Sequence, residues 1–163
     1  MKTKKIITLI TLILTTILYS TCYAISEEDL CLGQIKLDTS LEEIKSIYGD
    51  PIKEQQLMPK GTLYTFSYFI VRDGTFKSIE TKGINSLSTN KGIKFGSTGT
   101  EVKNTYGTPT IEEPNKLIMY QIRKTFKTYN GKTATMKQKL IFTLNNNIVE
   151  EIIIAEYPDD ETI

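Results

Sequence analysis

The sequence contains no histidine and no tryptophan, and only two cysteines occur among its 163 residues. Without histidine, a Ser-His-acid triad and a Cys-His dyad are both excluded within the chain. A cysteine-based zinc site needs a cluster of thiolates, which this sequence does not contain. The sequence contains no Gly-x-x-x-x-Gly-Lys run, the motif that would predict a phosphate-binding loop. We therefore expect no catalytic residue, no metal and no cofactor, and the chain is predicted not to be an enzyme.

Paired carboxylates are the remaining feature that would suggest catalysis. They occur at residues 42–43, 112–113 and 150–151. Adjacent residues on a helix or a strand point in different directions, so we interpret these pairs as parts of solvated faces. A glycosidase pair is the alternative hypothesis.

The first 24 residues are typical of a secretory signal. A basic start precedes an apolar stretch at residues 6–19, and small residues follow at Cys22 and Ala24. The stretch is shorter than the roughly 20 apolar residues that cross a membrane, so we predict no transmembrane helix after processing. Cleavage after Ala24 leaves 163 − 24 = 139 residues, expected to be secreted or periplasmic. A lipid on Cys22 is the alternative to cleavage after Ala24.

Processing changes both the charge and the cysteine count. The signal holds three of the 20 basic residues and none of the 19 acidic ones, which leaves 17 against 19 and a net charge of −2. Nucleic-acid-binding domains are strongly basic, so no nucleic-acid partner is expected. Cys31 is then the only cysteine, which excludes an intramolecular disulfide. Because Leu30 and Leu32 flank it, we predict a buried side chain; a free reactive thiol or an intermolecular bridge is the alternative.

The main signal is an internal repeat. Residues 35–51 align with residues 93–109 without a gap at an offset of 58, with identities at Ile, Lys, Glu, Lys, Tyr, Gly and Pro. In each copy a hydroxyl residue and a glutamate three positions later predict a capping box at the start of a helix. A glycine in the left-handed conformation and a following proline are expected to end that helix. The signature residues are Ser40, Glu43, Tyr48, Gly49 and Pro51 in the first copy and Thr98, Glu101, Tyr106, Gly107 and Pro109 in the second.

Strand patterns follow each predicted helix, rich in branched and aromatic residues and separated by Gly and Asn turn residues. The expected strands are residues 62–72 and 75–81 in the first copy and residues 117–129, 136–144 and 148–157 in the second. The fold class is therefore α+β, with two tandem repeats that each pack a short helical segment on a small antiparallel sheet. The predicted divisions are a signal at 1–24, repeat 1 at 25–84, a linker at 85–90 and repeat 2 at 91–163.

Two copies of a capped helix with Glu-Ile/Val-Lys and Tyr-Gly-x-Pro, each followed by a meander, resemble the β-lactamase inhibitory protein superfamily over residues 35–157. A single copy is similar to the outer-membrane small-lipoprotein A family, which serves in assembly of outer-membrane proteins. The first resemblance implies a concave sheet face that grips a protruding loop of another protein through aromatic and acidic residues. It implies a secreted or envelope-associated protein-binding module. The second implies a structural or assembly component of the cell envelope.

A basic arm is the first candidate contact surface. No acidic residue occurs between positions 114 and 149, whereas seven basic residues fall there around a predicted hairpin at 130–131. Strand alternation places Arg123, Lys137 and Lys139 on the outer face. These residues are predicted to bind an anionic partner such as an acidic protein loop, a wall polymer or lipid headgroups. The alternative is an edge strand that its lysines protect from aggregation.

Three aromatic residues form the second candidate. Tyr64, Phe66 and Tyr68 alternate along one predicted strand, so we expect them to point the same way. They form either the core layer of the first repeat or, if the core is filled instead by Leu63, Phe69 and Val71, an exposed set of contact residues.

Overall fold

The computed structural model describes residues 25–58 and 60–159; the predicted signal with Cys22 and Ala24 lies outside the described residues, as do residues 59 and 160–163. The described chain is an α+β protein built mostly of antiparallel strands. In chain order its elements are η1 (Glu27–Asp29), β1 (Cys31–Leu32), β2 (Ile35–Lys36), α2 (Leu41–Tyr48), β3 (Lys53–Gln56), β4 (Gly61–Thr65), β5 (Phe69–Gly74), β6 (Lys77–Thr81), α3 (Gly99–Tyr106), β7 (Ile111–Glu113), β8 (Leu117–Lys127), β9 (Thr133–Asn145) and β10 (Ile148–Pro158).

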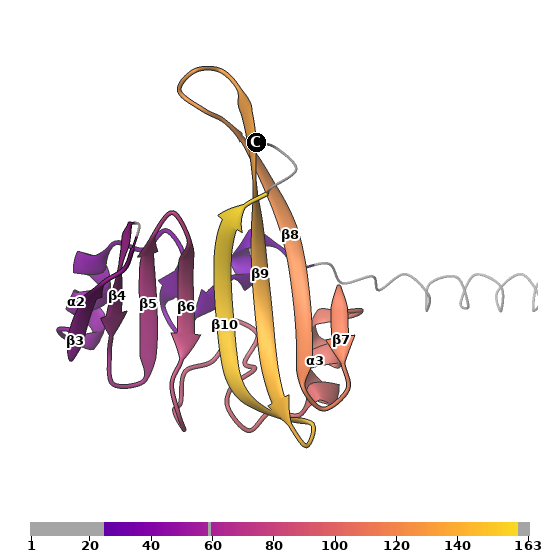
Figure 1. The fold of residues 1–163 in the computed structure, drawn as a ribbon. Helices are drawn as coiled ribbons and strands as arrows, with labels where there is room; N and C mark the ends of the chain where they lie inside the picture. Colours follow the sequence, from indigo (N-terminus) through magenta and orange to yellow (C-terminus); the bar gives the residue numbers. More distant parts are fainter. Residues whose placement is uncertain (1–24, 59, 160–163) are drawn as a thin grey trace, which may run out of the picture.

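Eight of these strands form one antiparallel sheet in the order β3-β4-β5-β6-β10-β9-β8-β7 (Figure 1). Each α-helix is followed by four consecutive strands, and the last strand of each set, β6 or β10, lies in the middle of the sheet. These two strands pair antiparallel, with Ile154 opposite Ile79. The two small sheets expected from the sequence are therefore joined. The pairing satisfies backbone groups that two separate sheets would leave on exposed edges.

The helices begin at the predicted residues. The Ser40 hydroxyl accepts a hydrogen bond from the Glu43 N–H at 3.2 Å, and the Thr98 hydroxyl accepts one from the Glu101 N–H at 3.1 Å. At α3 the Glu101 carboxylate also accepts from the Thr98 N–H at 2.6 Å, which completes the capping box and lowers the pKa of Glu101. At α2 the described residues form only the hydroxyl half of the box. Glu43 is exposed, so water solvates its carboxylate without the return bond.

The glycines that end the helices differ from the expectation in one dihedral angle. Gly49 has φ 81° and ψ −178°, and Gly107 has φ 77° and ψ −148°. The positive φ is as predicted, but the extended ψ places both outside the left-handed helical region, in a region that only glycine populates readily. A Cβ at Gly49 would meet no atom within 4 Å, so backbone strain and not crowding requires glycine there.

The predicted strand at residues 62–72 is wrong in one respect: it is two strands, β4 and β5. The chain turns at residues 66–68, where the Phe66 N–H donates to the Phe69 carbonyl at 2.9 Å. Besides the two-residue strands β1 and β2, strands β3 and β7 have no counterpart among the strands expected from the sequence. All their residues are exposed, so they lack the alternation of polar and apolar positions that identifies a strand. The three long strands β8, β9 and β10 correspond to the predicted meander.

One face of the sheet carries the core. Residues directly opposite each other across paired strands share a face. A single row on this face therefore runs across six strands through Tyr64, Val71, Ile79, Ile154, Leu140 and Tyr120. The helices cover this face with Ile44, Val102 and Tyr106, which are at most 1% exposed.

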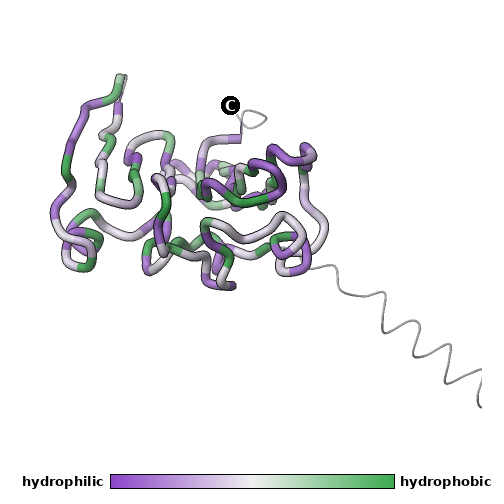
Figure 2. Tube along the Cα trace, turned by 90° about the horizontal axis from the view of Figure 1, so that it is seen from below, coloured by the Kyte–Doolittle hydropathy of each residue, from purple (hydrophilic) through white to green (hydrophobic). Residues whose placement is uncertain are grey.

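The opposite face is turned toward the viewer in Figure 1, with no described helix in front of it. Seen from below, the described chain forms two layers along which hydrophilic and hydrophobic stretches alternate (Figure 2). Among the described residues no helix has the length and apolar content of a membrane span.

Candidate functional site

The structure places the basic-arm residues on the open face. Arg123 lies directly opposite Lys137, and Gln121 lies opposite Lys139, on the face away from the buried Tyr120 and Leu140. The strand alternation expected from the sequence is thus confirmed. Beyond the end of β10, the strands β8 and β9 continue as a two-stranded arm, residues 125–135, which projects from the sheet in Figure 1.

Asp159, which follows β10, contacts the base of this arm. One oxygen of the Asp159 carboxylate is 3.0 Å from Nε of Arg123, and the other is 2.6 Å from Nζ of Lys137. The Asp159 side chain is only 3% exposed. Two of the three predicted anion-binding residues therefore already contact an anion of the same chain. Lys139 instead places its ammonium 4.8 Å from the centroid of the Tyr157 ring.

The three aromatic candidates do not share a strand face, and that part of the prediction is wrong. The alternative that they belong to the core holds for Tyr64 and Phe66 but not for Tyr68. Tyr64 lies in β4 on the core face, partly buried, opposite Val71. Strand β4 ends before Phe66, which is 2% exposed and stacks on Phe69 with a centroid distance of 4.6 Å. Tyr68 is in the turn and is 56% exposed. The alternation fails because the turn at residues 66–68 contains no Gly, Pro, Asn or Asp, so the segment reads as a continuous strand.

The signature tyrosines are core residues rather than contact residues. Tyr106 is 0% exposed, and its hydroxyl donates to Oγ1 of Thr89 at 2.8 Å. Burial raises its pKa to about 12. Tyr48 is partly buried; its ring lies edge-on to Phe69 at 5.0 Å, and its hydroxyl accepts from the Gln34 N–H at 3.2 Å. Both rings fix a helix end to neighbouring segments of the chain.

Cys31 is buried, as predicted. Its thiol donates to the Gly33 carbonyl at 3.3 Å, and burial raises the pKa of the thiol above its ordinary value. A raised pKa disfavours the thiolate, which is the reactive form of cysteine. The side chain therefore behaves as part of the core.

The sequence did not indicate a second group of side chains on the open face, which we call the cation–aromatic row. The rings of Phe76 and Tyr157 stack with a centroid distance of 5.9 Å. The Arg72 guanidinium carbon lies 5.5 Å from the Phe76 centroid, and Lys139 lies over Tyr157 at the other end. A cation over an aromatic ring is stabilised by about 0.5–1 kcal/mol at exposed sites. The row brings β5, the β5–β6 turn, β9 and β10 together.

The main electrostatic feature of the row is an unpaired hydrogen-bond donor on Arg72. Its Nε is buried and makes no hydrogen bond to any described residue. A buried donor left unpaired costs about 1–3 kcal/mol. A carboxylate is the acceptor whose geometry best fits a guanidinium. The sequence alone offered no signal for this site, because its members are far apart along the chain.

No group of three or more His, Cys, Asp or Glu residues in the described chain is placed to hold a metal ion. Comparison of the chain with protein-family models, curated proteins and solved structures finds no match in any of the three. The class of protein is thus defined by fold and site alone: an α+β domain whose eight-stranded antiparallel sheet has a helix-covered face and an open face.

Proposed function

We propose that the processed chain is a secreted or envelope-associated protein-binding module of two tandem repeats, inhibitor-like in architecture, and not an enzyme. The partner contacts the open face of the sheet. The observation that carries this proposal is the cation–aromatic row, with the unpaired Nε of Arg72 at one end. The row can accept a protein loop that brings a carboxylate to Arg72 and an apolar side chain to the rings.

Side-chain contacts that recur at the sequence offset support the two-repeat part of the proposal. Nζ of Lys45 lies 3.7 Å from Oε1 of Glu54, and Nζ of Lys103 lies 2.7 Å from Oε1 of Glu112. Both members of the second pair stand 58 positions after those of the first. In each half the same ion pair therefore joins the helix to the strand that follows it.

The turns before the two helices repeat in the same way. The Lys36 N–H donates to Oγ1 of Thr39 at 2.8 Å, and the Lys94 N–H donates to Oγ of Ser97 at 3.2 Å. In both turns the return backbone bond, from the hydroxyl residue to the lysine carbonyl, measures 3.1 Å. A common ancestral unit explains why two segments 58 residues apart use equivalent donors and acceptors.

The chemistry of the row favours a protein partner. Aromatic residues and arginine are enriched at the centres of protein interfaces, where they supply most of the binding energy. Phe76 is 40% exposed, and Tyr157 is partly exposed beside it. A partner that covers both rings would bury apolar area and would also satisfy Arg72.

Site-specific photocross-linking tests this proposal. A photoreactive phenylalanine analogue at position 157 should cross-link a protein from an envelope or secretome extract through a loop that contains Asp or Glu. The control is the same analogue at position 58, since Met58 is 94% exposed but lies in the β3–β4 hairpin. With the purified partner, Arg72→Met should weaken binding at least tenfold, as expected for a charged hydrogen bond of about 1.5–3 kcal/mol. Equal cross-linking from both positions, or unchanged affinity of Arg72→Met, would contradict the proposal.

The projecting arm favours a second function, that of a structural or assembly component held to an anionic part of the envelope. Tyr129 is fully exposed in the β8–β9 turn, and the exposed Lys127 and Lys132 flank it. In this case the processed chain should float with vesicles that contain anionic lipid and not with neutral vesicles. Lys127→Glu together with Lys132→Glu should abolish flotation and leave the photocross-link at position 157 unchanged.

A further inference from the structure

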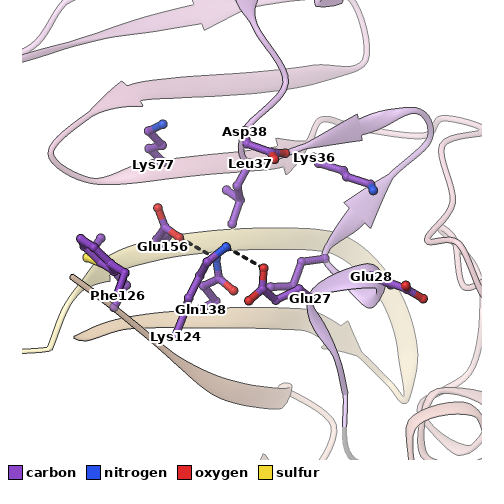
Figure 3. A pocket seen from close by; sticks show the side chains of 12 residues that line it. Glu27, Glu28, Lys36, Leu37, Asp38, Lys77, Lys124, Phe126, Gln138 and Glu156 are labelled. Atoms are coloured by element: carbon purple, nitrogen blue, oxygen red, sulfur yellow. Dashed lines mark hydrogen bonds and ion pairs between the residues drawn. The ribbon is translucent and has the colours of Figure 1, made fainter. Parts of the chain in front are cut away.

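A cleft of about 460 Å³ lies on the helix-covered side of the sheet, away from the cation–aromatic row (Figure 3). Strands β6, β8, β9 and β10 form its floor, and η1 with the segment around β2 forms its wall. This volume is within the range of small-molecule binding sites. Leu30, Leu37, Phe126 and Met136 give the cleft an apolar part, and Gln138 and charged side chains supply the rest.

The floor contains a buried acceptor without a partner. Gln138 is 5% exposed, and its Nε2 donates to the Glu156 carboxylate. A carboxylate can only accept, so this bond fixes which end of the amide is nitrogen. Oε1 of Gln138 is therefore an acceptor, and it receives no hydrogen bond from any described residue. Folded proteins rarely leave a buried carbonyl unpaired, so we expect Oε1 of Gln138 to accept a hydrogen bond from a ligand.

The charges nearest to Gln138 favour a cationic donor. In Figure 3 the side chains of Glu156, Lys124 and Glu27 converge around Gln138, whereas that of Glu28 points away. Lys77 lies opposite Glu156 across the β6–β10 pair, but its ammonium points away from Glu156 in Figure 3. The side chains around Gln138 are therefore two carboxylates and one ammonium, with an excess of negative charge. The pKa of Lys124 is raised, first by its hydrogen bond to Glu27 and further by Glu156, as a negative potential requires.

Lys124 occupies part of this centre as a weakly held side chain. Its Nζ lies 2.6 Å from Oε2 of Glu27, but the two side chains are 43% and 56% exposed. An exposed ion pair contributes little to stability, so another cation can replace it. Lys124 faces Met136 across the β8–β9 pair and is therefore a diagonal neighbour of Gln138 on the same face. Its displacement opens space beside the unpaired Oε1.

We propose that this cleft binds a primary ammonium group on an aliphatic stem. The ammonium donates one hydrogen bond each to Gln138 Oε1, Glu27 and Glu156, and the stem lies against Leu37 and Phe126. An ammonium has three donors, which matches these three acceptors, whereas a hydroxyl has one. The same chemistry is presented by a free aliphatic amine and by a lysine side chain of a peptide. Lys124 acts as the competing ammonium within the chain.

Titration of the processed chain with pentylamine, followed by NMR shifts of the cleft residues, tests the proposal. Pentan-1-ol has the same stem without the charge and should bind at least tenfold more weakly. Lys124→Met keeps the apolar stem and removes the competitor, so it should tighten pentylamine binding about tenfold, as expected for loss of a charged group's hydrogen bond. Gln138→Leu should weaken binding by a similar factor. Lys36→Met, on the wall of the cleft, is the matched control and should change the affinity less than twofold.

Equal binding of pentan-1-ol and pentylamine would overturn the proposal, and so would unchanged affinity of Lys124→Met. The affinity of Lys124→Met can still be measured if Gln138→Leu fails to fold, because Lys124 is exposed and its substitution leaves the core intact. A parallel titration with the capped tripeptide Gly-Lys-Gly separates the two sources. Tighter binding of the peptide than of pentylamine assigns the cleft to a protein lysine, and tighter binding of pentylamine assigns it to a free amine. Either outcome supports the ammonium site.

Discussion

Removal of the Tyr106 hydroxyl, by Tyr106→Phe, isolates one buried hydrogen bond in the second repeat. The ring stays in place against Phe142, at a centroid distance of 5.7 Å, so packing is preserved. The lost bond to Thr89 measures 2.8 Å and is fully buried, so its removal should cost about 1–1.5 kcal/mol. At the equivalent position, Tyr48→Phe removes a 3.2 Å bond to the exposed Gln34 N–H. Water can replace that bond, so the cost should stay below about 0.5 kcal/mol.

Urea unfolding of the two variants and the wild-type processed chain at pH 7 measures this difference. Thermal unfolding gives a second reading, with about 4 °C expected for each kcal/mol in a domain of this size. Because the pKa of Tyr106 is about 12, the free energy of unfolding should also depend on pH in the alkaline range. The native state holds this proton longer than the unfolded state, whose tyrosines titrate near pH 10, so stability falls between about pH 10 and 12. Tyr106→Phe should reduce that fall. Equal losses at positions 48 and 106, or an unchanged alkaline profile, would refute the reasoning.

Two further substitutions test the charge and backbone arguments. Burial alone would raise the pKa of Asp29. Hydrogen bonds from Lys91, the Ser26 backbone and Asn90 outweigh burial, so the pKa is lowered. Its stabilisation is therefore present above the unfolded pKa of about 4 and is lost as the pH falls through the folded value. Asp29→Asn should lower the free energy of unfolding by about 1–3 kcal/mol at pH 7. In urea unfolding at pH 3, the difference in this free energy between the variant and wild type should be smaller. Gly107→Ala should cost about 1–3 kcal/mol because φ is 77° with extended ψ. The control Thr100→Ala, at an exposed position of α3, should change the free energy of unfolding by no more than about 0.5 kcal/mol.

Local features of the fold could be predicted from the sequence because they depend on neighbouring residues. The hydroxyl cap and glycine stop define α2 and α3, and alternation with one Asn-Gly turn and one Asn-Asn turn defines the meander of β8, β9 and β10. The same alternation placed Arg123, Lys137 and Lys139 on one face. Strands β3 and β7 carried no such pattern, because both of their faces are exposed at the sheet edges.

Features that depend on distant residues could not be predicted in this way. The pairing of β6 with β10 includes a hydrogen bond from the Ile152 N–H to the Thr81 hydroxyl at 2.8 Å, across 71 positions of sequence. No periodicity within either segment encodes that register. The cation–aromatic row follows from this pairing, because it brings β5 and β6 beside β9 and β10.

The two proposed sites lie on opposite faces of the same strands, and this makes them separable. Gln138 and Lys139 are consecutive in β9, as are Glu156 and Tyr157 in β10. Consecutive strand residues point to opposite faces, so each pair contributes one residue to the ammonium cleft and one to the cation–aromatic row. Gln138→Leu should therefore weaken pentylamine binding without changing capture of the protein partner. Lys139→Met should do the reverse, because it removes a cation from the open face and leaves the cleft unaltered.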